Sequence, residues 1–193
     1  MSFSLLLEHI DRHITLTAPE QERLRTAAQV RKLKKKHYLL QEGEVSKGIA
    51  FVTEGILRSY ALDKNGFEHV IQFAPPGWWI VDMYSFVKQE PARLFIDAIE
   101  NSELLWLEKE EVNKLYADIP QLERFFRILS ENSVITYQQR LIGNLSLPAR
   151  ERYEHFCRQY PSLMQCLPQK QIASYIGVTP EFLSKMLNAP SGR

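Results

Sequence analysis

The spacing of apolar residues along the chain changes from helical to strand-like and back again. Up to about residue 31 it is helical, with Leu5, Ile10 and Ile14 in one run and Leu24 in the next. Thr17 lies between these runs and is a suitable N-cap for the second. Two short helices are therefore expected at the start of the chain.

Glycines at regular intervals mark the next part of the chain. Gly43, Gly55, Gly66 and Gly77 lie eleven or twelve residues apart. The runs around them are rich in aromatic and β-branched residues, and strands are expected at 49–53, 56–62, 67–73, 94–99 and 104–107. Residues 63–66 read Asp-Lys-Asn-Gly, a good hairpin connection because asparagine and glycine tolerate positive φ. This pattern predicts an antiparallel barrel or sandwich.

A long helix is expected from Gln121 to Leu145, where apolar residues form a broad stripe. At the usual rise per residue it would be about 38 Å long. That is more than is needed to cap a small sheet, so a second copy of the helix is expected to cover part of the stripe. The alternative is that the stripe packs only onto its own barrel. The predicted dimer contact consists of Leu122, Phe126, Leu129, Tyr137 and Leu141.

The stretch from 168 to 188 has the pattern of a helix-turn-helix. Ile172 and Ile176 make one apolar face, and Ala173 between them is small enough for a second helix to cross closely. Gly177 can end the first helix in a left-handed conformation, and Val178 can fill the corner. A hinge at 144–147 and a helix from Pro148 to Tyr160 are expected ahead of this motif.

The second helix of the motif is expected to begin at Pro180, after an N-cap at Thr179. Its inward face is predicted to carry Phe182 and Met186, with Leu183 or Leu187. The predicted DNA-binding residues, whose side chains can reach base edges or phosphates, are Gln169, Lys170, Thr179, Glu181, Ser184, Lys185 and Asn188. For this segment alone, the alternative is a two-helix corner of an ordinary helical domain.

Charge and composition add little to this picture. The chain has 193 residues, 45% of them hydrophobic, and a net charge of +1. From residue 147 onward, six basic residues against three acidic ones give +3, which leaves −2 for the remainder. Cys157 and Cys166 are too few for an iron-sulfur cluster or a structural zinc site, so no metal site is expected. Neither a signal peptide nor a membrane span is evident, which favours a cytoplasmic protein.

The order of barrel, long helix and terminal helix-turn-helix resembles the catabolite activator and FNR (Crp/Fnr) family of bacterial transcription regulators. The most family-like pieces are 39–44 (LLQEGE), 51–58 (FVTEGILR) and the Ala-x-x-Ile-Gly-Val core at 173–178. The resemblance implies an α+β fold: an effector-sensing, cyclic-nucleotide-binding-like jelly roll (1–120), a dimerisation helix with a hinge (121–146) and a DNA-binding helix-turn-helix domain (147–193). It also implies a homodimer, a palindromic site on double-stranded DNA, RNA polymerase as a further partner and a small-molecule effector.

The barrel departs from the cyclic-nucleotide-binding members of the family. Their phosphate cassette carries Gly-Glu and, later, an arginine next to serine or threonine, whereas the matching positions here are Val81-Asp82 and 92–94. These departures argue against a cyclic nucleotide, which stays the less favoured alternative, and leave the effector unassigned. The candidate effector pocket consists of Trp78, Trp79, Asp82, Tyr84 and Arg93, although plain loop polarity or core packing would explain the same residues.

The recognition helix departs from the family as well. The run Pro180-Glu181-Phe182, followed by Lys185, lacks the first arginine of the best-known members, which predicts a different DNA site. The main prediction is a DNA-binding transcription regulator controlled through the barrel. The alternative is a ligand-binding or protein-docking module whose helix-turn-helix no longer binds DNA. No catalytic residues are predicted, because no nucleophile elbow, phosphate loop or carboxylate pair stands out, and the chain is expected not to be an enzyme.

Overall fold

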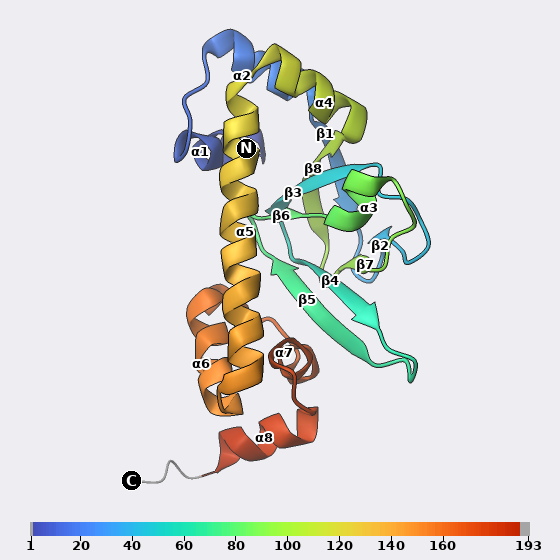
Figure 1. Cartoon of the computed structure of the whole chain (residues 1–193), viewed down its shortest axis with the longest axis vertical. Coiled ribbons are helices and arrows are strands. Elements are labelled where there is room, and N and C mark those ends of the chain that lie inside the picture. The colour runs from blue at the N-terminus through green and yellow to red at the C-terminus, as the bar shows by residue number, and fades with distance from the viewer. Residues whose placement is uncertain (1, 190–193) are drawn as a thin grey trace. The chain divides into compact units, whose positions relative to one another are not determined.

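The computed structural model describes residues 2–189, and their contacts divide the chain into two units (Figure 1). The first unit, called the sensor unit here, comprises 2–61 and 71–131. The second, called the helical unit, comprises 62–70 and 132–189. These boundaries differ from the expected ranges 1–120, 121–146 and 147–193, because the long helix is shared between the units and a hairpin tip belongs to the second. Residues 190–193 of the last range lie outside the described residues.

The strands of residues 2–189 form two four-stranded antiparallel sheets. One has the order β1-β8-β3-β6 and the other β2-β7-β4-β5. The strands are β1 (Gln29–Leu33), β2 (Tyr38–Leu40), β3 (Gly48–Glu54), β4 (Leu57–Leu62), β5 (Glu68–Ala74), β6 (Trp79–Ile80), β7 (Phe95–Ala98) and β8 (Ser102–Glu108). This confirms the predicted α+β fold with an N-terminal jelly-roll barrel.

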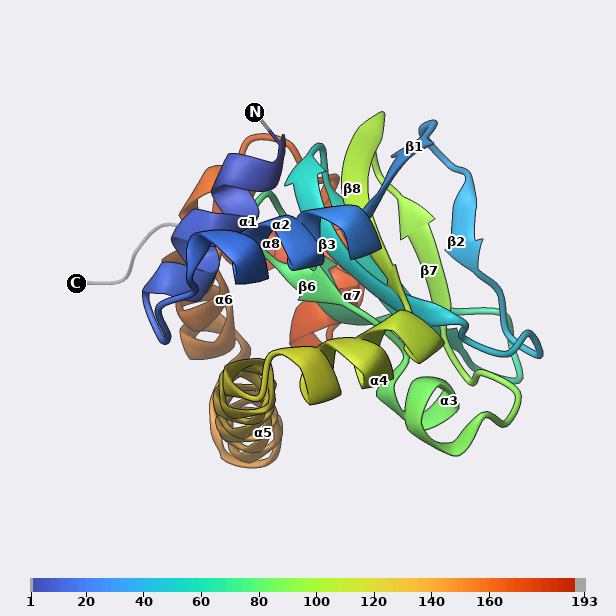
Figure 2. The ribbon, with the colours of Figure 1, turned by 90° about the horizontal axis from the view of Figure 1, so that it is seen from above.

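Helices cover one face of the first sheet (Figure 2). They are α1 (Ser2–Asp11), α2 (Ala18–Ala27), α4 (Lys109–Asp118) and the start of α5 (Gln121–Ser146). The expected cap at Thr17 is present, because Glu20 accepts hydrogen bonds from its backbone N–H and its hydroxyl, both at 2.7 Å. A further short helix, α3 (Met83–Lys88), follows β6.

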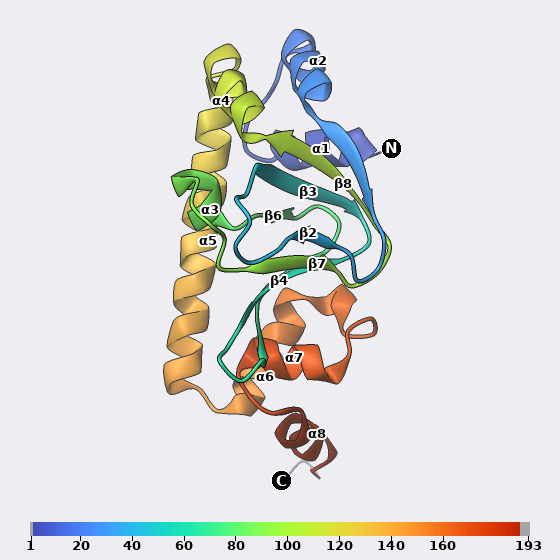
Figure 3. The same cartoon turned by 90° about the vertical axis from the view of Figure 1, so that its right-hand side faces the viewer.

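The central strand β3 is buried on both faces, which explains its almost continuous apolar sequence. Ala50 and Val52 point into the space between the two sheets, which Figure 3 shows as separate layers. Ile49 and Phe51 point to the other side, under the helices. The interior between the sheets is filled by aliphatic side chains, among them Leu57, Ile96 and Leu104, together with the ring of Trp106.

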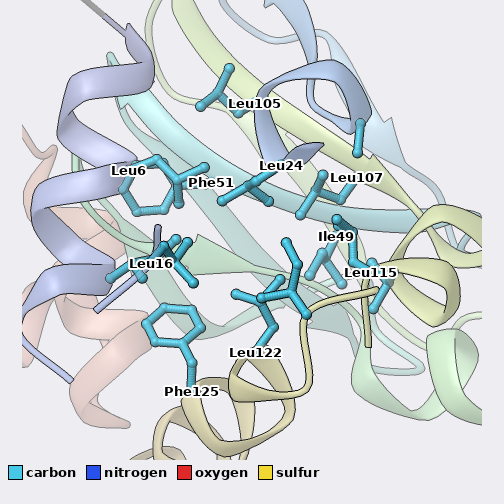
Figure 4. Packing of buried hydrophobic residues seen from close by; sticks show 14 of the residues in the cluster. Leu6, Leu16, Leu24, Ile49, Phe51, Leu105, Leu107, Leu115, Leu122 and Phe125 are labelled. Atoms are coloured by element: carbon cyan, nitrogen blue, oxygen red, sulfur yellow. The ribbon is translucent and has the colours of Figure 1, made fainter. Parts of the chain in front are cut away.

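The larger core lies between the first sheet and the helices (Figure 4). Leu6 of α1, Leu24 of α2 and Leu115 of α4 meet strand residues such as Phe51 and Leu107 there. The first turns of α5 add Leu122 and Phe125 to the same core. Burial of this many apolar side chains fixes the start of α5 on the sensor unit.

Turn geometry confirms the strand pattern expected from the glycines. At Gly55, between β3 and β4, φ is +77°, and an added Cβ would lie 2.3 Å from Ser102 Oγ. The expected hairpin connection forms as well, because Asp63 Oδ1 accepts from the backbone N–H groups of Asn65 and Phe67 at 2.8 and 3.0 Å. These two turns therefore lie at the positions that the glycine spacing predicted.

Besides the hairpin tip 62–70 and the end of α5, the described part of the helical unit contains three α-helices and a 3-10 turn. They are α6 (Ala149–Gln159), the 3-10 turn η1 (Pro161–Leu163), α7 (Gln169–Ile176) and α8 (Pro180–Asn188). The break between α5 and α6 spans Leu147 and Pro148, at the end of the expected hinge.

Candidate nucleic-acid interface

An aromatic cluster holds the helical unit together. The rings of Phe156, Tyr160 and Tyr175 lie in mutual contact, with centroids 5.2 to 5.6 Å apart. Ile172 of α7 and Leu183 of α8 are buried in the same unit. Burial, reinforced by Tyr175, raises the pKa of Tyr160 well above its usual range, so this phenol stays neutral. Helices α7 and α8 therefore pack in a unit that is built around buried aromatic rings.

The turn between α7 and α8 has the geometry that the sequence predicted. Gly177 ends α7 with φ at +72° and ψ at +43°, in the left-handed region, and its N–H donates to Ser174 at 3.2 Å. Thr179 then caps α8, because its hydroxyl oxygen accepts from the backbone N–H of Phe182 at 3.2 Å. The helix-turn-helix is thus fixed at both sides of its turn.

Two arginines of α6 hold the C-terminal ends of the motif helices. Arg152 Nη1 donates to the Ile176 carbonyl at 2.6 Å, and Arg150 Nη2 donates to the Met186 carbonyl at 2.9 Å. A cation at a helix C-terminus satisfies free carbonyls and complements the helix dipole. Two of the six basic residues from 147 onward therefore have a structural role within the helical unit. Sequence spacing gave no sign of this, since it depends on how α6 crosses α7 and α8.

The outward face of α8 carries most of the residues predicted to bind DNA. Glu181, Lys185 and Asn188 are exposed, and their spacing of four and three residues puts them on one side of the helix. Thr179 is exposed but its hydroxyl is engaged in the cap, and Ser184 is half-buried. Gln169 and Lys170 are exposed at the first turn of α7.

The prediction for Phe182 is wrong. It was expected to face inward, but its side chain is 53% exposed, whereas its neighbour Leu183 is fully buried. Met186 and Leu187 are half-buried, so the inward face centres on Leu183 rather than on Phe182. Both are apolar residues in the same turn, so the periodicity alone could not decide which one the fold covers. The outward face of α8, named the recognition face here, thus consists of Glu181, Phe182, Lys185 and Asn188.

The hairpin tip 62–70 is bonded to the other elements of the helical unit. Ser174 Oγ of α7 donates to the Glu68 carbonyl at 2.5 Å and accepts from the Val70 N–H at 2.9 Å. Arg140 of α5 donates to the carbonyls of Val70 and Tyr175, both at 2.7 Å, and stacks on the Tyr175 ring at 3.9 Å. This group of bonds, named the hairpin clamp here, joins three elements and was not foreseen from the sequence.

The five residues proposed for an effector pocket divide into groups: Asp82, Tyr84 and Arg93 are in contact, whereas Trp78 and Trp79 pack against two different cores. Trp79 packs against Phe51 and Phe126 in the core under the helices, with centroids 5.1 and 5.2 Å apart. Trp78 packs instead against the interior between the sheets. Tyr84 and Arg93 form an exposed pair with the guanidinium 4.5 Å above the ring.

Asp82 is the fifth of these residues. It has a structural role and is not simply a polar residue of an exposed loop. Its side chain is buried and caps α3 by accepting from the Ser85 N–H at 3.0 Å. Its other oxygen accepts from the N–H groups of Arg93 and Leu94 at 3.1 and 3.2 Å. One backbone donor at the N-terminus of α3, the Ser85 N–H, and the N–H groups of Arg93 and Leu94 are therefore already bonded to a carboxylate of the chain itself.

Only part of the predicted dimer contact is exposed on α5. Leu122 is buried in the core of the sensor unit, and Phe126 and Leu129 pack against that core, which leaves these three little surface for a partner. Tyr137 and Leu141 are exposed. The exposed apolar residues of the second half of the helix are Val134, Ile135, Tyr137, Leu141, Ile142 and Leu145, named the α5 stripe here. The pairs 134 and 141, and 135 and 142, repeat every seven residues, as in a coiled coil.

The described residues were also compared with the requirements of a metal site, a disulfide and a membrane-spanning helix. In 2–189, no three His, Cys, Asp or Glu side chains are grouped as a metal ion would require. The two cysteines are free, and burial raises the pKa of the Cys157 thiol. A search of the same residues for helices able to cross a bilayer finds none with the necessary length and apolar character.

Comparison with known proteins agrees with this geometry. Residues 30–118 match the family model of the cyclic nucleotide-binding domain. No curated protein matches the sequence closely enough to indicate a relationship.

Solved structures share the fold over most of the chain. The c-di-GMP responsive global regulator CLP of Xanthomonas campestris has a TM-score of 0.72 at 13% identity, covering 89% of this chain and 90% of that chain. FixK2 from Bradyrhizobium japonicum has a TM-score of 0.72 at 20% identity, covering 86% and 89%. A regulator from Eubacterium rectale, assigned to the Crp/Fnr family, has a TM-score of 0.70 at 16% identity, covering 89% and 82%. The predicted resemblance to this family is confirmed in the fold.

Proposed function

We propose that this chain, whose cyclic nucleotide-binding domain lies within a Crp/Fnr-type fold, is a cytoplasmic DNA-binding regulator of transcription that acts as a homodimer. The proposal involves no catalysis. The observation that carries it is the recognition face of α8, a fixed and exposed helix face with Glu181 and Lys185 in its first two turns. Glutamate can accept from cytosine N4, and lysine can donate to guanine or to phosphate.

The α5 stripe supports the homodimer. Six large apolar side chains on one helix, each at least 46% exposed, form a patch of the kind that marks an interaction site. Their seven-residue repeat suits pairing with a second copy of the same helix. Two recognition helices related by a two-fold axis would then read half-sites about one DNA turn, or roughly 34 Å, apart.

The sensor unit is proposed to receive a signal other than a cyclic nucleotide. Asp82 takes up the backbone N–H groups of Ser85, Arg93 and Leu94, so these donors are not open to a phosphate. We propose that the signal acts by population shift, favouring the arrangement in which both DNA-binding units fit the groove together. RNA polymerase is the remaining proposed partner, since regulation of transcription must act on it.

The test is selection of bound sequences from a random duplex pool by the full-length protein at physiological salt. Wild type is expected to enrich a palindrome, and Lys185→Ala is expected to lose base preference or at least about tenfold in affinity, as expected for one lost base contact. A matched control is Lys64→Ala, which removes an exposed cation of the hairpin tip.

The selection should be repeated with cyclic AMP, cyclic GMP and cell extract added separately. Enrichment that needs cyclic AMP or cyclic GMP would contradict the proposed role of Asp82. Failure to enrich any sequence under all three conditions would overturn the proposal and favour a ligand-binding or protein-docking module instead.

A further inference from the structure

Phe182 is the one large apolar side chain on the recognition face, and its position is well defined. Its backbone N–H is bonded by the Thr179 cap, so it lies in the first turn of α8. The next residue, Leu183, anchors the helix in the core with no exposed surface. The phenyl ring is therefore held on the outside by the same residues that fix the helix.

The other members of the recognition face surround this ring with polar chemistry. Lys185 follows Phe182 by three residues and Glu181 immediately precedes it, so all three extend from the first two turns. Single exposed apolar residues are common and need no explanation by themselves. Phe182 differs in its position, because the first turns of a recognition helix are the part that reaches base edges.

The charge around Phe182 favours a polyanion as the partner. Lys185 lies on the same face as Phe182, and Lys170 is exposed at the first turn of α7, so both cations are open to a polyanion. A phenyl ring has no conventional hydrogen-bonding group, so at a base edge its favourable partner is an apolar group. On the major-groove edges of B-DNA that group is the C5 methyl of thymine.

We propose that Phe182 reads thymine through its C5 methyl group, next to the base pairs that Glu181 and Lys185 contact. This inference rests on the proposed function and deepens it, because it assigns a base preference to one residue. It predicts an A·T pair at a fixed position in each half-site.

The test removes the methyl group alone. In the site selected by wild type, each thymine is replaced in turn by deoxyuridine, which keeps all hydrogen-bonding groups. At one position in each half-site, the replacement is expected to lower affinity about fourfold, the effect of losing one buried methyl-sized group. Replacement at that position in both half-sites is expected to lower affinity about fifteenfold. Phe182→Ala is expected to bind the thymine and deoxyuridine duplexes equally.

The matched control is Phe67→Ala, which removes an equally large and even more exposed ring from the hairpin tip of the same unit, 64% exposed against 53%. Phe67→Ala should retain the full sensitivity to deoxyuridine. Because both rings are exposed, the midpoint of thermal unfolding of each variant should stay near that of wild type, which excludes misfolding as the cause.

The outcomes separate the two proposals. If wild type binds a palindrome but tolerates deoxyuridine at every position, or if Phe182→Ala stays sensitive to it, the assignment of Phe182 is overturned while the regulator remains. If Phe182→Ala has the affinity of wild type for every duplex, the ring contributes nothing to DNA binding and the assignment is overturned as well. If wild type selects no sequence at all, the proposed function itself has failed.

Discussion

At the scale of single residues, Asp82 shows how an apparent ligand residue can be a structural one. Its carboxylate accepts from three backbone N–H groups in a buried site. Asp82→Ala leaves those donors unpaired and should lower the free energy of unfolding by about 1–3 kcal/mol. Chemical denaturation measures this, with the exposed Glu42→Ala as the control. A change below 0.5 kcal/mol, roughly the level of a surface substitution, would contradict the structural role.

His9 of α1 makes stability depend on pH at the same scale. Burial, with the nearby charges of Arg12 and His13, lowers its pKa from 6.5 to about 4. Between these values the unfolded chain takes up a proton that the folded chain does not, so stability falls as pH drops from 6.5 toward 4. We expect a loss of about 1–2 kcal/mol, allowing for the solvent that reaches this half-buried ring. Urea unfolding at several pH values tests it. His9→Gln should flatten the profile in this window, and an unchanged profile would contradict the assignment.

At the scale of elements, two glycines of the helical unit should respond in opposite ways to alanine. Gly177 ends α7 at φ +72°, and an added Cβ would lie 3.3 Å from Arg152 Nη1, so Gly177→Ala should cost about 1 kcal/mol or more. Gly143 lies inside α5 without positive φ, and its added Cβ would make ordinary contact at 3.6 Å. Gly143→Ala should therefore stabilise by up to about 1 kcal/mol. Thermal unfolding of both variants measures the difference, and a Gly177→Ala variant at least as stable as wild type would refute the turn geometry.

At this scale, local features of the elements can be predicted from the sequence, whereas contacts with distant elements cannot. The turn glycines, the cap at Thr179 and the long helix α5 depend on neighbours within one turn, so the sequence predicts them well. Which apolar residues of a helix are covered depends on elements far away in the chain. That is why Phe182 and Leu122 were each assigned to the wrong face, and why the bonds of Asp82 to residues 93 and 94 were missed.

At the scale of the whole molecule, the chain crosses between the sensor unit and the helical unit three times: at either end of the hairpin tip 62–70 and within α5. The proposed regulation requires connections between the two units that move together. The hairpin clamp provides one inside the helical unit, because Arg140 of α5 bonds both Val70 of the hairpin tip and Tyr175 of α7.

Arg140→Met keeps most of the apolar stem and removes both of these bonds. Amide hydrogen exchange should then rise together in 62–70 and in 169–176, because each segment loses a partner that it shares with the other. The strands β1, β3 and β8 should keep the protection of wild type. The control is Arg127→Met, since Arg127 pairs only with Glu131 on the exposed surface of the same helix at 2.6 Å. If exchange rises in α7 alone, the hairpin tip is held independently of Arg140, through its bonds to Ser174, and the shared role of Arg140 is contradicted.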